Sequence, residues 1–392
     1  TGVVVFYGAN DGFLHAINGN QTSGIGSFQA GSELWSFIAP EHYGKLKRLY
    51  DNTLGITLPT VNDGTQKPYF FDGPITAHKS ASVTWLYATQ RRGGRMIYAF
   101  DVTSPTNPVL KWRQGCPNQN NDTDCTNAGI VDIGQTWSAA QVFKSSGYEV
   151  AGTPQPMLII GGGYDTCEDG TILSDLNTCT AALKGNKIYI LDADSGALLK
   201  TFTTARSVAA TVTVVPNKIT GLADYAYAVD TGGNIYRVTM GADLPANWSM
   251  VKIASLGCDT SICPGGVANR KFLFAPEVVV TPNFNAILVG SGDREHPLLT
   301  HFTTTSVDNA FFMIKDNPAD PTWWLSEVPI CNGQALACMT SLLPIDPDDM
   351  NIPSETDLTA KKGWYLAFGS GDHDKEQVVT SAVVAMGTVT FS

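Results

Sequence analysis

Two groups of ionisable residues have the composition that acid–base or metal chemistry requires. The run Asp293–His296 places a histidine beside two carboxylates, which is how general bases are commonly built. Four carboxylates lie between Asp165 and Asp175 and could together coordinate a cation. Both groups also fit a structural explanation, because mixed charges at turns form ion pairs and acidic loops are usually solvated. We therefore predict no catalytic residue, and the sequence contains no Gly-x-Ser-x-Gly, His-Glu-x-x-His or phosphate-loop motif.

The eight cysteines fall into four pairs that are close in sequence. No pair has the Cys-x-x-Cys spacing of zinc or thioredoxin-type sites, and no histidine lies beside any of them. The pairs lie in loop-like stretches, so we predict four local disulfides that hold loops: Cys116 with Cys125, Cys167 with Cys179, Cys258 with Cys263, and Cys331 with Cys338. Disulfides persist in oxidising compartments, and this predicts an extracytoplasmic protein.

The composition excludes several classes of protein. The 392 residues are 43% hydrophobic and 16% charged and include 38 glycines and 21 prolines, which excludes a disordered chain, a coiled coil and most helical bundles. The formal charge of −11 argues against a nucleic-acid partner, and no apolar run approaches the roughly 20 residues of a membrane helix. The sequence begins inside a predicted strand, so we expect it to be an excised piece of a longer protein.

One pattern recurs along the chain: a tight turn, usually containing glycine, followed by a strand of alternating character. The glycines allow positive φ in the turn, and alternate side chains of the strand then face opposite sides of a sheet. Tyr189 and Tyr236 occupy equivalent places in two copies and lie 47 residues apart, the length of one four-stranded blade. The five copies are Gly8–Ile17, Gly93–Asp101, Gly185–Gly196, Asp230–Val238 and Asp308–Ile314.

These repeats predict an all-β fold. We expect residues 1–392 to form a single β-propeller with seven blades and disulfide-bounded loop insertions, although six or eight blades also fit the spacing. The first segment, Val3–Ile17, and the last, Val383–Phe391, are both predicted strands, and their pairing would close the ring and remove its edges. One short helix is expected over Glu41–Tyr50.

Several strings carry a family resemblance and occur in order over most of the chain. They are Gly8–Ala16, Phe71–Pro74, Ile133–Ser138, Gly161–Asp165, Tyr189–Gly196 and Gly290–Pro297. Together they resemble the C-terminal propeller of the PilY/PilC family of type IV pilus biogenesis proteins and tip adhesins. The blades of this family are similar to those of quinoprotein dehydrogenases, and this similarity is architectural.

The resemblance implies a function at the pilus tip. The expected partners of such a protein are minor pilins and a host or surface receptor. Its expected location is the pilus tip, the cell surface, or the outer membrane and periplasm. The implied role is to support pilus assembly and extension against retraction, twitching motility and attachment. The alternative function is that of an enzyme, a periplasmic quinoprotein-like oxidoreductase. Many such enzymes use a vicinal disulfide, and no two cysteines here are adjacent.

The resemblance also implies a calcium loop, which should lie at Pro216–Asp224. Such a loop needs oxygen ligands at alternate positions, a glycine at the sixth and a carboxylate near its end. Only Gly221 and Asp224 fit this pattern, and Lys218 places a positive charge where the cation should lie. We therefore expect no cofactor and a degenerate site. A remnant would use Thr220 and Asp224 with very weak affinity.

Two adjacent tryptophans are candidates for contact with a partner. Trp323 and Trp324 follow a proline-containing turn and precede a predicted disulfide loop. Tryptophan is enriched at protein interfaces, so one ring could anchor a partner. The alternative is that both rings belong to the core between blades.

Overall fold

The computed structural model describes residues 2–51, 68–169, 183–257, 269–293, 307–346, 353–368 and 376–392. Two α-helices occur among these residues, and all other regular structure is strand or short 3-10 helix. The helices are α1 (Tyr43–Asp51), close to the predicted position, and α2 (Glu355–Ala360). No helix in these ranges is long and apolar enough to cross a membrane.

Five antiparallel sheets, one of which gains a parallel edge strand, account for most of the strands. The first sheet contains β1 (Val4–Gly8), β2 (Leu14–Asn18) and β3 (Glu33–Phe37). The second contains β4 (Ile75–Lys79), β5 (Thr84–Thr89), β6 (Arg95–Asp101) and β7 (Val109–Cys116). The third contains β8 (Gln141–Phe143), β11 (Met157–Gly161), β12 (Lys187–Asp192) and β13 (Leu198–Thr203).

The fourth sheet contains β14 (Thr213–Pro216), β15 (Ala223–Val229), β16 (Asn234–Thr239) and β17 (Ser249–Ser255). The fifth contains β18 (Glu277–Val280), β19 (Asn285–Gly290), β20 (Ala310–Asp316), β22 (Gly363–Ala367) and β21 (Leu343–Ile345). Two further pairs are β9 (Glu149–Val150) with β10 (Thr153–Pro154), and β23 (Val383–Ala385) with β24 (Thr388–Thr390).

Each copy of the sequence repeat supplies the corresponding strand of a different sheet. The five copies contribute β2, β6, β12, β16 and β20. Every one of these strands pairs antiparallel with the strand before it in its sheet, as a hairpin requires. The recurring pattern therefore identified one strand per blade.

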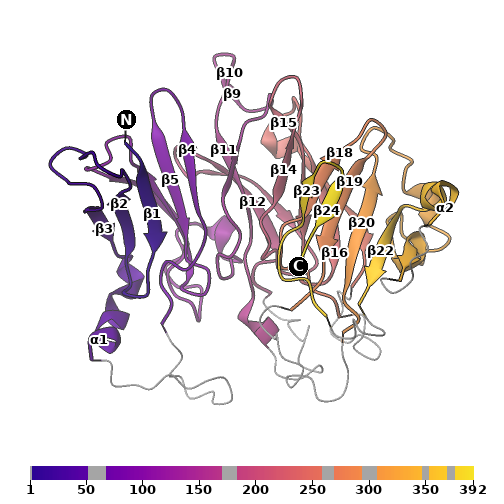
Figure 1. Cartoon of the computed structure of the whole chain (residues 1–392), viewed down its shortest axis with the longest axis horizontal. Coiled ribbons are helices and arrows are strands. Elements are labelled where there is room, and N and C mark those ends of the chain that lie inside the picture. Colours follow the sequence, from indigo (N-terminus) through magenta and orange to yellow (C-terminus); the bar gives the residue numbers. More distant parts are fainter. Residues whose placement is uncertain are drawn as a thin grey trace.

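The sheets stand side by side, with β1–β3 and the pair β20 and β22 at opposite ends (Figure 1). The strands β4, β8, β14, β18 and β23 are neighbours in this order, so they form the inner wall around which the blades are arranged. Buried hydrophobic clusters fill the successive interfaces between sheets. Both faces of a middle strand such as β11 are buried, since each sheet packs against two neighbours.

The predicted pairing of the two terminal segments is wrong for the strands that the structure describes. β1 pairs only with β2, and β23 pairs only with β24. The first sheet also has three strands where the next three have four. Alternating character marks a segment as a strand but does not say which edge it joins. The described strands form five blades and the beginning of a sixth, so the blade number of seven stays a prediction.

Candidate functional site

The segment at the expected calcium position is a tight turn between β14 and β15. The backbone N–H of Gly221 donates to the carbonyl of Asn217 at 2.8 Å, and the N–H of Asn217 donates to the carbonyl of Leu222 at 2.7 Å. Gly221 has a φ of +71°, a conformation that glycine adopts without steric cost. The turn is therefore closed by its own backbone, with no wide loop to surround an ion.

The oxygen atoms that calcium would need already have partners inside this turn. The Asp224 carboxylate accepts a hydrogen bond from Asn217 Nδ2 at 2.9 Å, and the Thr220 hydroxyl accepts one from the N–H of Leu222 at 3.2 Å. Lys218 Nζ donates to the carbonyl of Val280 at 3.3 Å, so its charge stays beside the turn. The degenerate calcium site stays a prediction.

We expect calorimetric titration with Ca²⁺ to show no micromolar binding at this turn. Calcium loops gain affinity from several free carboxylates, and here one carboxylate is present and already engaged. The Asp224→Ala variant should give the same heats as the parent protein. A micromolar signal that Asp224→Ala abolishes would contradict the prediction.

Two predicted disulfides lie within the described residues. Cys116 bonds to Cys125 and Cys331 bonds to Cys338, each closing a short loop between strands. Cys167 is also disulfide-bonded. Its predicted partner Cys179 and the pair Cys258 and Cys263 lie outside the described residues.

The structure gives the two adjacent tryptophans different environments. The Trp324 ring is buried in the core between the fourth and fifth sheets, and its Nε1 donates to Asp316 Oδ1 at 3.3 Å. The Trp323 ring is partly buried, and Lys362 Nζ lies 3.8 Å from its centroid. The Trp323 Nε1 donates to the carbonyl of Lys315 at 3.0 Å, so Trp323 is the more exposed of the two rings but is also held in place. Contact of either ring with a partner stays a prediction.

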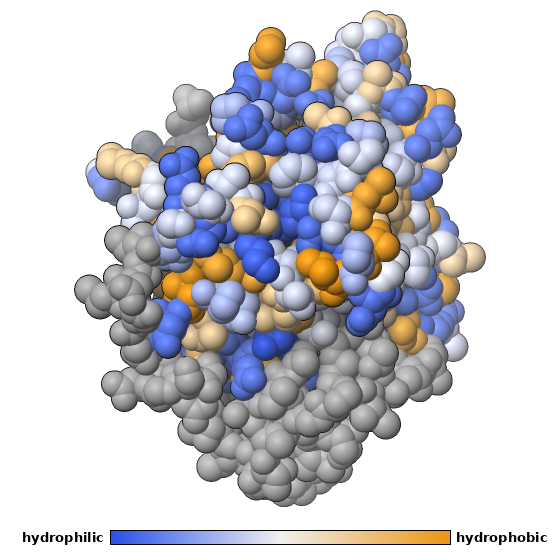
Figure 2. Space-filling view, turned by 90° about the vertical axis from the view of Figure 1, so that its right-hand side faces the viewer, coloured by the Kyte–Doolittle hydropathy of each residue, from blue (hydrophilic) through white to orange (hydrophobic). Residues whose placement is uncertain are grey.

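Trp323 belongs to residues 317–342, which we call the β20–β21 insertion. The Cys331–Cys338 disulfide closes its second half, and its exposed apolar side chains include Leu325 and Ile330, 57% and 47% exposed. On the side of the molecule that carries α2, hydrophobic residues lie among hydrophilic ones (Figure 2). An apolar surface of this kind, held in place by a disulfide, is suited to contact with a protein.

Asp293, a candidate for acid–base chemistry, and Glu168, a candidate cation ligand, both form ion pairs with Lys271. The sequence analysis did not identify this lysine. Lys271 is fully buried, and its Nζ lies 3.0 Å from Asp293 Oδ2 and 3.4 Å from Glu168 Oε2. Burial lowers the pKa of Lys271, but the two carboxylates outweigh burial and raise it. These acids neutralise a buried cation. Residues 294–296 and Asp175 lie outside the described residues.

His15 lies between two carboxylates on the first sheet. Its Nδ1 is 2.7 Å from Glu33 Oε1 and its Nε2 is 3.0 Å from Asp11 Oδ2. Burial lowers the pKa of His15, but the hydrogen bonds and negative charges of Glu33 and Asp11 together raise it above 6.5. Both ring nitrogens can donate only in the protonated ring, so the geometry favours the cation.

We expect an NMR titration to place the pKa of His15 above 6.5 and that of His78 below it. Burial and the nearby Lys144 lower the pKa of His78. His78 is therefore an internal control, because its pKa should shift in the direction opposite to that of His15. Because the folded pKa of His15 is raised, its contribution to stability is complete below pH 6.5 and is lost as the pH rises through the folded value. Glu33→Gln should lower the pKa of His15. An unchanged value in this variant would contradict the assignment.

A family model described as the PilY1 beta-propeller domain matches residues 2–247, more than half of the chain. The chain belongs to the PilY1 beta-propeller family. A PilY1 type IV pilus biogenesis factor of Pseudomonas aeruginosa is 29% identical over 242 residues, covering 59% of this chain and 17% of that protein. A PilY1 homologue of Xylella fastidiosa is 23% identical over 410 residues, covering 99% of this chain and 24% of that protein.

The PilY1 fold extends over nearly the whole chain. The crystal structure of the Pseudomonas aeruginosa PilY1 C-terminal domain matches with a TM-score of 0.61 at 18% identity, covering 98% of this chain and 75% of that one. At this identity the match shows the fold, and it confirms the predicted propeller. The chain spans between about a sixth and a quarter of the length of the curated PilY1 relatives.

Proposed function

We propose that this chain is a non-catalytic interaction module of a type IV pilus biogenesis factor. In this proposal it acts outside the cytoplasm, at the pilus tip or cell surface, and docks to minor pilins. Docking supports pilus extension against retraction, twitching motility and attachment to a surface or host receptor. The observation that carries the proposal is the match of residues 2–247 to the PilY1 propeller, because the curated relatives are named as pilus biogenesis factors.

Contacts between blades support a mechanical role. The Tyr87 hydroxyl on the second sheet donates to the carbonyl of Ala193, in the turn between β12 and β13 of the third sheet, at 2.9 Å. Arg237 on the fourth sheet forms an ion pair of 2.7 Å with Asp316 on the fifth. Polar contacts of this kind, together with buried apolar interfaces, resist the separation of blades under a pulling force. A module at the tip of a retracting fibre must withstand such a force.

The β20–β21 insertion is the surface that we propose for docking. Trp323 and Leu325 provide apolar area, and the Cys331–Cys338 bridge reduces the entropy lost on binding. Tryptophan side chains at the centre of interfaces contribute a large share of the binding energy. We therefore assign the partner contact to Trp323, with Trp324 as its support in the core.

The test is binding of the purified chain to purified minor-pilin ectodomains, measured by interferometry with Ca²⁺ and then with chelator. We expect binding in the micromolar range or tighter that does not respond to chelator. Leu325→Asp should weaken it by about tenfold or more, as for an interface residue. The matched control is Leu110→Asp, since Leu110 on β7 is 46% exposed and lies outside the insertion.

Each other outcome contradicts a specific part of the proposal. Absence of binding in both conditions would contradict docking to minor pilins by this part of the protein. Binding that chelator removes would keep the docking and contradict the degenerate calcium site. Equal losses in Leu325→Asp and Leu110→Asp would place the contact outside the β20–β21 insertion.

A further inference from the structure

The sequence contains two Asn-Gly pairs, Asn18-Gly19 and Asn332-Gly333. In such a pair the backbone nitrogen of the glycine can attack the side-chain amide of the asparagine. Glycine favours this reaction because it has no Cβ to obstruct the approach and moves freely in φ and ψ. The two pairs have the same local chemistry, so any difference in their reactivity comes from their places in the fold.

The first pair is enclosed by the first sheet. Asn18 is fully buried on β2, and its Nδ2 donates to the carbonyls of Ser23 at 3.1 Å and Gln29 at 3.0 Å. The space beside the glycine is also occupied, since a Cβ at Gly19 would lie 2.9 Å from Val5 Cγ2. The Asn18 amide is therefore held by its hydrogen bonds and shielded by packing.

The second pair lies on the surface, inside the loop that the Cys331–Cys338 disulfide closes. Asn332 and Gly333 are both exposed, and their φ angles of +54° and +79° place them in a left-handed turn. Within the described part of the chain, the Asn332 side chain has no hydrogen-bond partner. A Cβ at Gly333 would meet no described atom within 4 Å. The Asn332 amide and the glycine nitrogen thus have room to react.

One hydrogen bond restrains the glycine nitrogen of the second pair. The N–H of Gly333 donates to the carbonyl of Val328 at 3.0 Å, and this bond must break before the nitrogen can attack. Residues 332–335 are all exposed, so the turn can open without disturbing the core. Local opening of exposed turns costs far less free energy than the opening of a sheet, which Asn18 would require.

We propose that Asn332 is a site of spontaneous deamidation. The Gly333 nitrogen loses its proton to hydroxide and forms a bond to Asn332 Cγ, and the Cγ–Nδ2 bond breaks as Nδ2 leaves as ammonia. Water then opens the resulting cyclic succinimide. Attack of water on Cγ gives aspartate, and attack on the backbone carbonyl carbon gives isoaspartate. The only reactants are the chain and water, and no oxidant or reductant takes part.

The modification changes the charge and the backbone of the β20–β21 insertion. Either product adds a negative charge to the insertion that also exposes Leu325 and Ile330. Aspartate tolerates the left-handed turn, whereas isoaspartate lengthens the backbone and disrupts the hydrogen bond from Gly333 to Val328. The reaction needs no partner, so this inference goes beyond the proposed docking and does not depend on it.

The test is uptake of heavy oxygen by the whole chain, because hydrolysis of the succinimide takes one oxygen atom from water. The folded protein, with its disulfides intact, is incubated in heavy-oxygen water at mildly alkaline pH, and its peptides are analysed by mass spectrometry. We expect Asn332 to acquire heavy oxygen at least about tenfold faster than Asn18. Uptake should be slower at mildly acidic pH, because the attacking nitrogen must lose its proton.

An unfolded sample and one variant assign the cause. In guanidinium with the disulfides reduced, the two asparagines should react at rates within about threefold of each other, because neither keeps its native protection. Asn332→Gln should remove the uptake from its peptide, since the longer side chain would have to close a larger ring. Uptake at Asn18 should be the same in this variant as in the parent protein.

Three results would overturn the proposal. The first is equal uptake at the two asparagines in the folded protein, or faster uptake at Asn18. The second is no uptake at Asn332 in the folded protein over a period in which the unfolded sample reacts. The third is undiminished uptake in the same peptide of Asn332→Gln, which would place the reaction at another residue such as Gln334.

Discussion

Replacement of Asp316 by alanine is expected to lower the free energy of unfolding by about 3–5 kcal/mol. Asp316 is fully buried, and its carboxylate accepts from Arg237 at 2.7 Å and from the Tyr227 hydroxyl at 2.7 Å. The alanine variant would leave the Arg237 charge largely buried without its partner. Removal of one member of a buried pair costs more than the pair itself contributes, because the remaining charge stays desolvated.

The measurement is guanidinium denaturation of the two proteins, followed by tryptophan fluorescence. The matched control is Asp194→Ala, which removes the acidic partner of Lys111 at the contact between the second and third sheets. Asp194 is 63% exposed, so its loss should cost at most about 1 kcal/mol. Similar losses for the two variants would show that the fourth and fifth sheets do not depend on the buried carboxylate.

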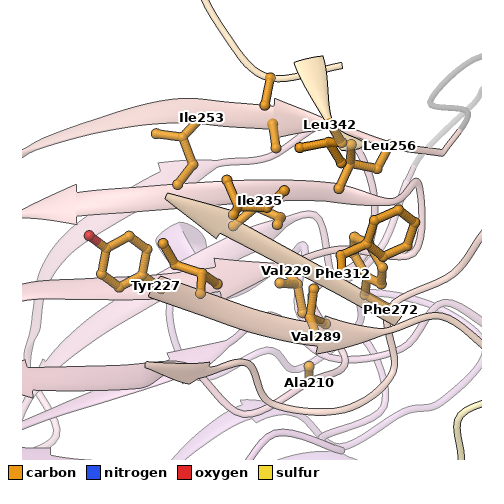
Figure 3. Close-up of a cluster of buried hydrophobic side chains, with 14 of the residues drawn as sticks. Ala210, Tyr227, Val229, Ile235, Ile253, Leu256, Phe272, Val289, Phe312 and Leu342 are labelled. Carbon is orange, nitrogen blue, oxygen red and sulfur yellow. The ribbon is translucent and has the colours of Figure 1, made fainter. Parts of the chain in front are cut away.

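Replacement of Phe312 by alanine is expected to cost about 3–5 kcal/mol by a different mechanism. Phe312 is fully buried on β20, and its ring packs beside Phe272 in the cluster between the fourth and fifth sheets (Figure 3). Its ring centroid is 5.8 Å from that of Phe272, in an edge-to-face arrangement. Alanine would leave a cavity that the surrounding strands cannot close, since their hydrogen bonds fix their spacing.

Denaturation of a graded series separates the loss of packing from a general defect. Phe312→Leu should cost less than Phe312→Ala, because it leaves a smaller cavity. Tyr50→Ala is the surface control, since Tyr50 is 90% exposed on α1, and it should change stability by no more than about 0.5 kcal/mol. If Phe312→Ala cost no more than Tyr50→Ala, the cluster would not stabilise the interface between these sheets.

The strand repeat and the short helix could be predicted because each depends on residues close in sequence. A glycine turn followed by alternating side chains specifies a hairpin locally, and each of the five copies became a strand of its own sheet. The disulfides Cys116–Cys125 and Cys331–Cys338 were predictable for the same reason, since each closes a short loop. The calcium-loop pattern at Pro216–Asp224 was also judged from neighbouring residues, and the degenerate site that it implies stays a prediction. Sequence reasoning did not identify Asn217, whose side chain engages Asp224.

Contacts between blades could not be predicted from the same information. Lys271 contacts Glu168, which lies 103 positions earlier in the sequence. The sequence around Lys271 resembles an ordinary solvated basic stretch. The different burial of Trp323 and Trp324 depends on how deeply each ring enters the cluster between the fourth and fifth sheets. Such contacts are set by the rotation and separation of whole sheets, which no local pattern encodes.

The sequence by itself determined the kind of fold, one strand in each of the five main sheets, two of the local disulfide loops and the family. These follow from the two-residue period of strands, from turn chemistry and from motifs in order. Only the tertiary structure decided that the terminal strands do not pair with each other and which charges meet across blades. The reason is physical: strand pairing within a blade is local, whereas the packing of sheets joins residues that lie tens to hundreds of positions apart.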